Sequence, residues 1–178
     1  ANFNGPLYVD FSKLNITGTI ARETFKNMCK DNTGSINFVL SGLTTPTLVD
    51  DSFTEMFSQN SGPINLDMSS FNPTEISTAA FSRMFDRNEG PINLDMSSFD
   101  PTTVDSTVFK GMFSSGSFSE DNTGKIINID LRALRNNKDA LEKMLTNYYF
   151  DADAGAILKT TSQPTFNLVQ FSNDGRFT

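Results

Sequence analysis

The 178-residue chain contains no histidine and no tryptophan, and it has a single cysteine, Cys29. Without histidine it lacks the side chain that enzymes use most often as a general base near neutral pH. One cysteine cannot form a disulfide within the chain, so the fold cannot depend on a disulfide framework. We therefore expect no enzyme activity, no catalytic residues, no metal site and no cofactor.

Long apolar runs and positive charge are also scarce. No stretch approaches the roughly 18 consecutive apolar residues that would span a membrane. The chain begins at Ala1, with neither an initiator methionine nor a signal-like segment, and we expect it to have been processed or trimmed. Lys and Arg number 14 against 21 Asp and Glu, a net charge of −7. This acidic balance disfavours nucleic acid as a partner and favours a cationic one.

The most informative feature that is present is a repeat. The words INLDMSSFNPT at Ile64 and INLDMSSFDPT at Ile92 are nearly identical and start 28 residues apart. A looser copy starts at Ile36, and slot-matched copies start at Leu7 and Ile127. Repetition at such a period is typical of stacked repeat proteins, in which each unit buries its apolar face against its neighbours.

Each unit opens with alternating apolar and polar residues, which predicts a strand with one buried and one solvated face. In the unit at Ile64, the apolar residues are Ile64, Leu66 and Met68. An Asn/Asp-Pro-Thr or Thr-Pro-Thr turn follows in the central units and leads the chain out of the strand. Since the units run in the same direction, their strands are expected to pair in register as a parallel sheet.

The second half of each unit predicts a short helix. Large apolar residues stand at i, i+3 and i+4, as in Phe53, Met56 and Phe57. Asp51 and Ser52 provide N-cap chemistry before this segment. The glycines that follow these segments suit a left-handed helix end; they are Gly34, Gly62, Gly90 and, after an insertion near Ser115–Thr123, Gly124.

These patterns together predict an α/β repeat fold, a leucine-rich-repeat-like solenoid with a parallel β-sheet on one face and short helices on the other. We expect a single solenoid domain over residues 1–178, with repeats near 7–35, 36–63, 64–91, 92–126 and 127–155. A C-terminal cap is expected over 156–178, in which the alternating segment around Phe166 and Leu168 could add an edge strand.

The wording of the central units resembles the repeat of BspA-type leucine-rich surface proteins. In that family a Leu-Asp-Leu-Ser-x-Phe strand is followed by a turn and a segment that ends in Met-Phe. The matching residues here are Leu66, Asp67, Met68, Ser69 and Phe71 with Met84 and Phe85, and Leu94, Asp95, Met96, Ser97 and Phe99 with Met112 and Phe113. The resemblance implies a leucine-rich-repeat-like solenoid with an adhesive or partner-binding role at a cell surface. The units are longer than the family's commonest form, and the motif is missing after Leu131.

The solvated face of the predicted sheet is the candidate site. Stacking places asparagines in one column and aspartates in the next. The candidate binding residues are Tyr8, Asp10, Asn37, Asn65, Asp67, Ser69, Asn93, Asp95, Ser97, Asn128, Asp130 and Arg132. Neighbouring asparagines, about 4.8 Å apart, could form an amide ladder that stabilises the sheet, or could serve a ligand. Adjacent aspartates repel one another, and a raised pKa, hydrogen bonds to Ser69 or Ser97, or a bound cation could relieve the repulsion. Cys29 occupies a slot that phenylalanine fills elsewhere and is predicted to be a core thiol.

The function that follows is recognition. We expect a non-enzymatic module, extracellular or at a cell surface, that binds a protein partner or host-surface receptor, possibly a glycan, through its strand face and rim loops. The alternative is a structural component of a virion or surface assembly that acts by self-association. The sequence leaves the oligomeric state open.

Overall fold

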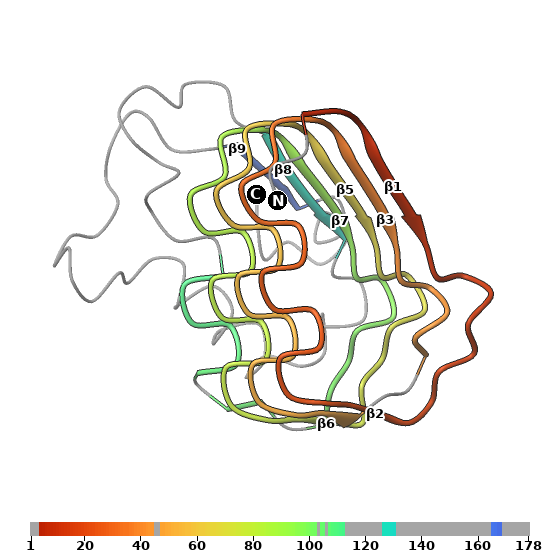
Figure 1. The fold of residues 1–178 in the computed structure, drawn as a ribbon. Coiled ribbons are helices and arrows are strands. Elements are labelled where there is room, and N and C mark those ends of the chain that lie inside the picture. Colours follow the sequence, from red (N-terminus) through yellow and green to blue (C-terminus); the bar gives the residue numbers. More distant parts are fainter. Residues whose placement is uncertain are drawn as a thin grey trace, which may run out of the picture.

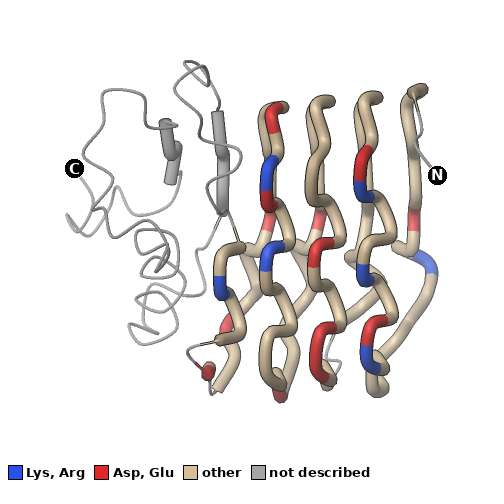
Figure 2. Tube along the Cα trace, turned by 60° about the vertical axis from the view of Figure 1, so that its left-hand side comes forward, with Lys and Arg blue, Asp and Glu red and all other residues tan. Residues whose placement is uncertain are grey.

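The computed structural model describes residues 4–44, 47–102, 104–105, 107–112, 126–130 and 165–168, with the last two ranges described as backbone strands. Within these residues the chain winds into a parallel β-solenoid (Figure 1). We call one circuit of the chain a rung; rungs 1 to 4 start at Leu7, Ile36, Ile64 and Ile92. Figure 2 shows these rungs standing side by side, with the rung nearest the N-terminus at one end of the stack.

The main sheet contains the strands that open the rungs. They are β1 (Leu7–Asp10), β3 (Ile36–Val39), β5 (Ile64–Asp67), β7 (Ile92–Asp95), β8 (Ile126–Asp130) and β9 (Thr165–Leu168), in that spatial order and all parallel. The register pairs Leu7 with Ile36, Ile36 with Ile64, and Ile64 with Ile92. Ile92 pairs with Ile127 and Ile127 with Phe166. This confirms the predicted parallel alignment and the added strand near Phe166.

A second, narrower sheet follows the turn that leaves each main strand. It consists of β2 (Thr19–Ile20), β4 (Thr47–Leu48) and β6 (Glu75–Ile76), again parallel and in chain order. The sequence analysis did not foresee this sheet, because two-residue strands are too short to show an alternating pattern.

The prediction of short helices is wrong for the residues that the structure describes. Residues 22–31, 50–59, 78–87 and 107–112 are chains of turns, and we call them the turn wall. A positive φ recurs at every fourth residue, for example at Asp51, Glu55 and Gln59. A left-handed residue at each fourth position interrupts helical dihedrals before a second helical turn can form. The expected N-caps, such as Asp51, therefore precede no helix, and the segment at Leu141, Met144 and Leu145 lies outside the described residues.

Backbone hydrogen bonds in the turn wall divide between two directions. N–H groups of alternate residues close turns within a rung, as from Thr54 to the carbonyl of Asp51 at 3.2 Å. The intervening N–H groups donate to the next rung, as from Phe53 to the carbonyl of Ala80 at 2.8 Å and from Phe81 to that of Val108 at 2.9 Å. Pairing across rungs satisfies backbone groups that an isolated chain of turns would leave to water.

Phenylalanine rings fill the space between the sheets and the turn wall. Phe25, Phe53, Phe81 and Phe109 stack in a column with ring-centroid separations of 4.8, 5.3 and 5.7 Å. Phe71 meets Phe53 and Phe81 edge-on, which links the column to the main sheet. The repeat thus places identical side chains in contact, and the core is continuous along the stack.

The glycines before each strand serve close packing rather than helix termination. A Cβ atom on Gly62 would lie 2.1 Å from the carbonyl oxygen of Gly34, and one on Gly90 would lie 2.2 Å from that of Gly62. Neither these two residues nor Gly34 has a positive φ. The prediction of left-handed stops at these glycines is therefore wrong, and Gly124 lies outside the described residues.

Several predicted features fall outside the described residues: the insertion near Ser115–Thr123, the possible strand at Ala156–Lys159 and most of the expected cap. In the part of the chain that the structure describes, no helix has the length and apolar character of a membrane span.

Candidate functional site

The outer face of the main sheet, which we call the sheet face, carries the predicted asparagine ladder. Nδ2 of Asn65 donates to Oδ1 of Asn37 at 2.9 Å, and Nδ2 of Asn93 donates to Oδ1 of Asn65 at 2.7 Å. The ladder is thereby confirmed, and each asparagine donates toward the N-terminal neighbour. Asn65 and Asn93 are exposed. After these bonds Asn65 still has one N–H and one oxygen lone pair available to a ligand.

The aspartates of the next column end the strands. Oδ1 of Asp10 accepts the backbone N–H of Ser12 at 2.7 Å, and Asp67 and Asp95 accept those of Ser69 and Ser97 at 2.9 Å. Among the three expected forms of relief, hydrogen bonding to the serines is observed, although the donor is the backbone rather than the hydroxyl. A carboxylate that accepts a nearby N–H closes an Asx turn. The aspartates therefore shape the exit from each strand.

Repulsion in this column is limited further by its composition. Val39 separates Asp10 from Asp67, while Asp67 stands directly beside Asp95 in the register. The pKa of Asp10 is lowered, chiefly by hydrogen bonding from the Ser12 side chain and backbone, so Asp10 does not follow the raised-pKa alternative. Among the described residues no three His, Cys, Asp or Glu side chains gather as they would around a metal ion.

The remaining candidate residues lie at the two ends of the sheet face. Tyr8 is 68% exposed, and its hydroxyl donates to Oδ2 of Asp10 at 3.3 Å. Asn128 and Asp130 pair with Asn93 and Asp95 through the backbone of β8, which continues both columns. Arg132 lies outside the described residues. The sheet face thus brings most of the predicted residues together as one flat array.

A second column of asparagines, inside the molecule, escaped the sequence analysis. Asn32, Asn60 and Asn88 are buried, and Oδ1 of Asn60 accepts the backbone N–H of Asn32 at 2.5 Å. Oδ1 of Asn88 accepts the N–H of Asn60 at 2.9 Å. The signal was an Asn-x-Gly motif that precedes Ile36, Ile64 and Ile92 at the repeat period. Its role is structural, since these side chains do not reach solvent.

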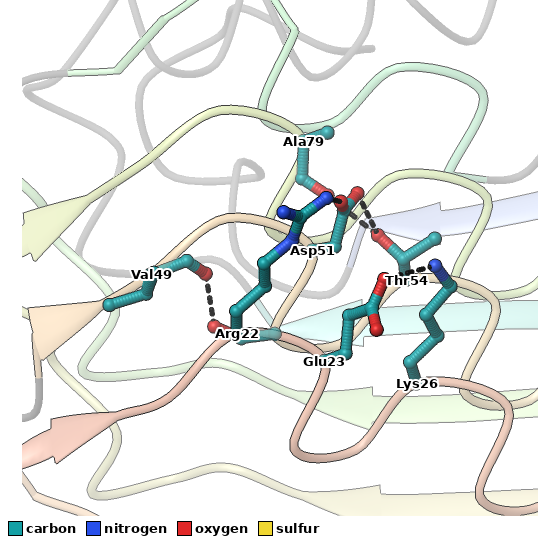
Figure 3. A network of polar contacts seen from close by, with 8 residues as sticks. Arg22, Glu23, Lys26, Val49, Asp51, Thr54 and Ala79 are labelled. Atoms are coloured by element: carbon teal, nitrogen blue, oxygen red, sulfur yellow. Dashed lines mark hydrogen bonds and ion pairs between the residues drawn. The ribbon is translucent and has the colours of Figure 1, made fainter.

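The turn wall carries charged pairs that join the first two rungs. Figure 3 shows Arg22 reaching Asp51 of the next rung, at 3.7 Å, and Lys26 beside Glu23 at 2.6 Å. Nζ of Lys30 lies 2.8 Å from Oε2 of Glu55, and this contact lowers the pKa of Glu55. Figure 2 shows acidic and basic positions interspersed along this wall. Such exposed pairs contribute little stability individually, and their mixed sign gives no single-sign field for steering a ligand.

Cys29 lies in the core, as predicted, with 3% of its surface exposed. Burial raises the pKa of its thiol to about 11, which keeps it protonated and unreactive at neutral pH. The chemistry of the described surface is therefore hydrogen bonding by amides, carboxylates and hydroxyls.

Comparisons of the chain with protein-family models, with curated proteins and with solved structures find no match.

Proposed function

We propose that the protein is a non-enzymatic interaction module that binds a macromolecular partner through its sheet face. The observation that carries this proposal is the exposed ladder of Asn37, Asn65 and Asn93, flanked by aspartates held in Asx turns. Polar groups fixed at the spacing of neighbouring strands can meet a ligand without first losing conformational freedom. The resemblance of the repeat to BspA-type surface proteins supports the same role.

The proposed partner is a protein or a host-surface receptor, with a glycan as the other chemistry suited to the face. Amide and carboxylate groups favour hydrogen-bonding ligands with cationic or polyhydroxyl character. We place the protein outside the cell or at a cell surface, in keeping with the repeat resemblance. The leucine-rich-repeat relationship belongs to this proposal as well, since the turn wall replaces the helices it implied.

The test compares a sheet-face variant with a matched variant on the turn wall. Asn65→Ala with Asn93→Ala removes the ladder, whereas Thr24→Ala with Ser82→Ala removes neutral polar groups from the turn wall. Each protein is applied to arrays of glycans and of purified receptor ectodomains. We expect the wild type and the turn-wall variant to bind the same ligand, and the ladder variant to lose at least tenfold in affinity, about 1.4 kcal/mol. Equal binding by all three proteins would contradict the proposal.

A further inference from the structure

Rung 1 leaves exposed the positions that the inner rungs bury. Met28 is 47% exposed, whereas Met56 and Met84, in the same slot of rungs 2 and 3, are fully buried. Leu14 is 46% exposed, while Leu43 in its slot is 1% exposed. These side chains lie where a preceding rung would stack. The N-terminal end of the solenoid therefore presents an apolar surface shaped like the inside of the stack.

Hydrogen bonds in the turn wall give this end a defined polarity. Every bond between rungs here runs from an N–H group to a carbonyl of the following rung, as from Phe25 to Ser52 and from Cys29 to Met56. The carbonyls of Thr24, Lys26, Met28 and Lys30 occupy the accepting positions in rung 1, and no described residue donates to them. An occupant of this end must therefore supply N–H donors.

A buried side chain asks for the same donor. Oδ1 of Asn60 and of Asn88 each accepts an N–H from the preceding rung. Asn32 is 1% exposed, yet its Oδ1 has no hydrogen-bond partner among the described residues. An unsatisfied buried acceptor costs about 1–3 kcal/mol, so a donor at this position would stabilise the end of the stack.

The strand edge at this end completes the pattern. β1 is the first strand of the main sheet and is paired on one side only, with β3 (Figure 1). N–H groups of Leu7 and Phe11 donate to β3, so in a parallel ladder the backbone groups of Tyr8 and Asp10 point to the open side. Pro6 does not blunt this edge, because Pro63 and Pro91 hold the same slot inside the stack, where their carbonyls accept N–H groups from Ile36 and Ile64.

We propose that this end binds the C-terminal end of a second copy of the chain, so that copies stack head to tail. β9 is the opposite end strand of the described sheet and runs parallel to β1. Its residues Phe166, Asn167 and Leu168 repeat the apolar–Asn–apolar order of the inner strands and would take the register positions beside Leu7, Tyr8 and Val9. The main sheet would then continue from one copy into the next.

A symmetric dimer through two N-terminal ends does not fit the same observations. It would place the free carbonyls of one turn wall against those of the other, with no donors between them. A head-to-tail contact is instead heterologous and does not close on itself, so assemblies grow with concentration. This interface involves the end of the solenoid and not the sheet face, so it stands independently of the proposed binding function.

The test measures weight-average mass by light scattering and sedimentation up to millimolar chain concentration. We expect the mass of the wild type to rise continuously, without a plateau at the dimer. Met28→Lys would bury an unpaired charge in the contact and should weaken association by about tenfold or more. Tyr8→Pro removes an N–H that points away from β3 and should act likewise. Ser70→Lys adds the same charge at an exposed site in rung 3 and should leave association unchanged.

Mixing distinguishes the geometry. Met28→Lys is blocked at its N-terminal end only, so in excess it should still seat on wild-type chains and shorten their assemblies. Circular dichroism and melting temperature verify that each variant is folded. A wild type that stays monomeric throughout would overturn the second copy as occupant. A plateau at a dimer that the variant cannot join would overturn the head-to-tail geometry.

Discussion

Asn60 receives the backbone N–H of Asn32 on its Oδ1 atom, at 2.5 Å, across the boundary between two rungs. Its Nδ2 also donates to the carbonyl of Phe57 at 2.8 Å. One buried side chain thus binds a neighbouring rung and its own rung together.

Replacing this side chain should be costly. Asn60→Ala leaves the N–H of Asn32 and the carbonyl of Phe57 unpaired in the interior, and we expect a loss of about 2–4 kcal/mol in the free energy of unfolding. Asn32→Ala removes only the longer bond from Nδ2 to the carbonyl of Gly34, at 3.3 Å, and should cost less. Urea denaturation of both variants checks the order. A larger loss for Asn32→Ala would contradict the ladder.

The glycine column allows a test with an internal control. Gly62→Ala places a methyl group 2.1 Å from the carbonyl oxygen of Gly34, and the rungs must separate to admit it. We expect destabilisation of about 3 kcal/mol or more. Gly18→Ala meets nothing within 4 Å and should change stability by less than about 1 kcal/mol. Similar melting temperatures for the two variants would show that the rungs do not approach as closely as described.

Two adjacent alanines on the turn wall should respond oppositely to the same change. Ala79 has a φ of 56°, which strains an L-residue, whereas Ala80 is buried and has no positive φ. Ala79→Gly relieves roughly 1 kcal/mol of strain and should be neutral or stabilising. Ala80→Gly loses a buried methyl group and should cost about 1–2 kcal/mol. Chemical denaturation measures both, and a loss at Ala79 as large as that at Ala80 would argue against a left-handed residue there.

The buried thiol predicts how stability depends on alkaline pH. Cys29 ionises near pH 8.5 in an unfolded chain, whereas its folded pKa is about 11. Its contribution to stability is complete below the unfolded pKa and is lost as the pH rises through the folded value. We expect the difference in unfolding free energy between wild type and Cys29→Ala to shrink from pH 8 upward. In the native protein at pH 8, thiol reagents should modify Cys29 only after urea is added, and rapid native labelling would refute its burial.

Much of the architecture could be predicted from the sequence, since the period and the alternation at Ile64, Leu66 and Met68 fix both the strands and their register. The helices could not, because apolar residues at i, i+3 and i+4 fit one turn of a helix and a chain of four-residue turns equally well. Gly111, in the slot of Glu55 and Arg83, was the available sign of a left-handed position. On the candidate site, alternation identified Asn65 correctly, whereas Asn60 was missed because polar residues before a glycine are typical of exposed loops.

The stacking of the turn wall is the central claim, and through-hydrogen-bond scalar couplings measured by NMR test it most directly. The account predicts a coupling from the amide nitrogen of Phe53 to the carbonyl carbon of Ala80, and another from Phe81 to Val108. A coupling from Phe53 to Val49 instead, four residues back, would establish a helix in place of the turn wall and contradict the account.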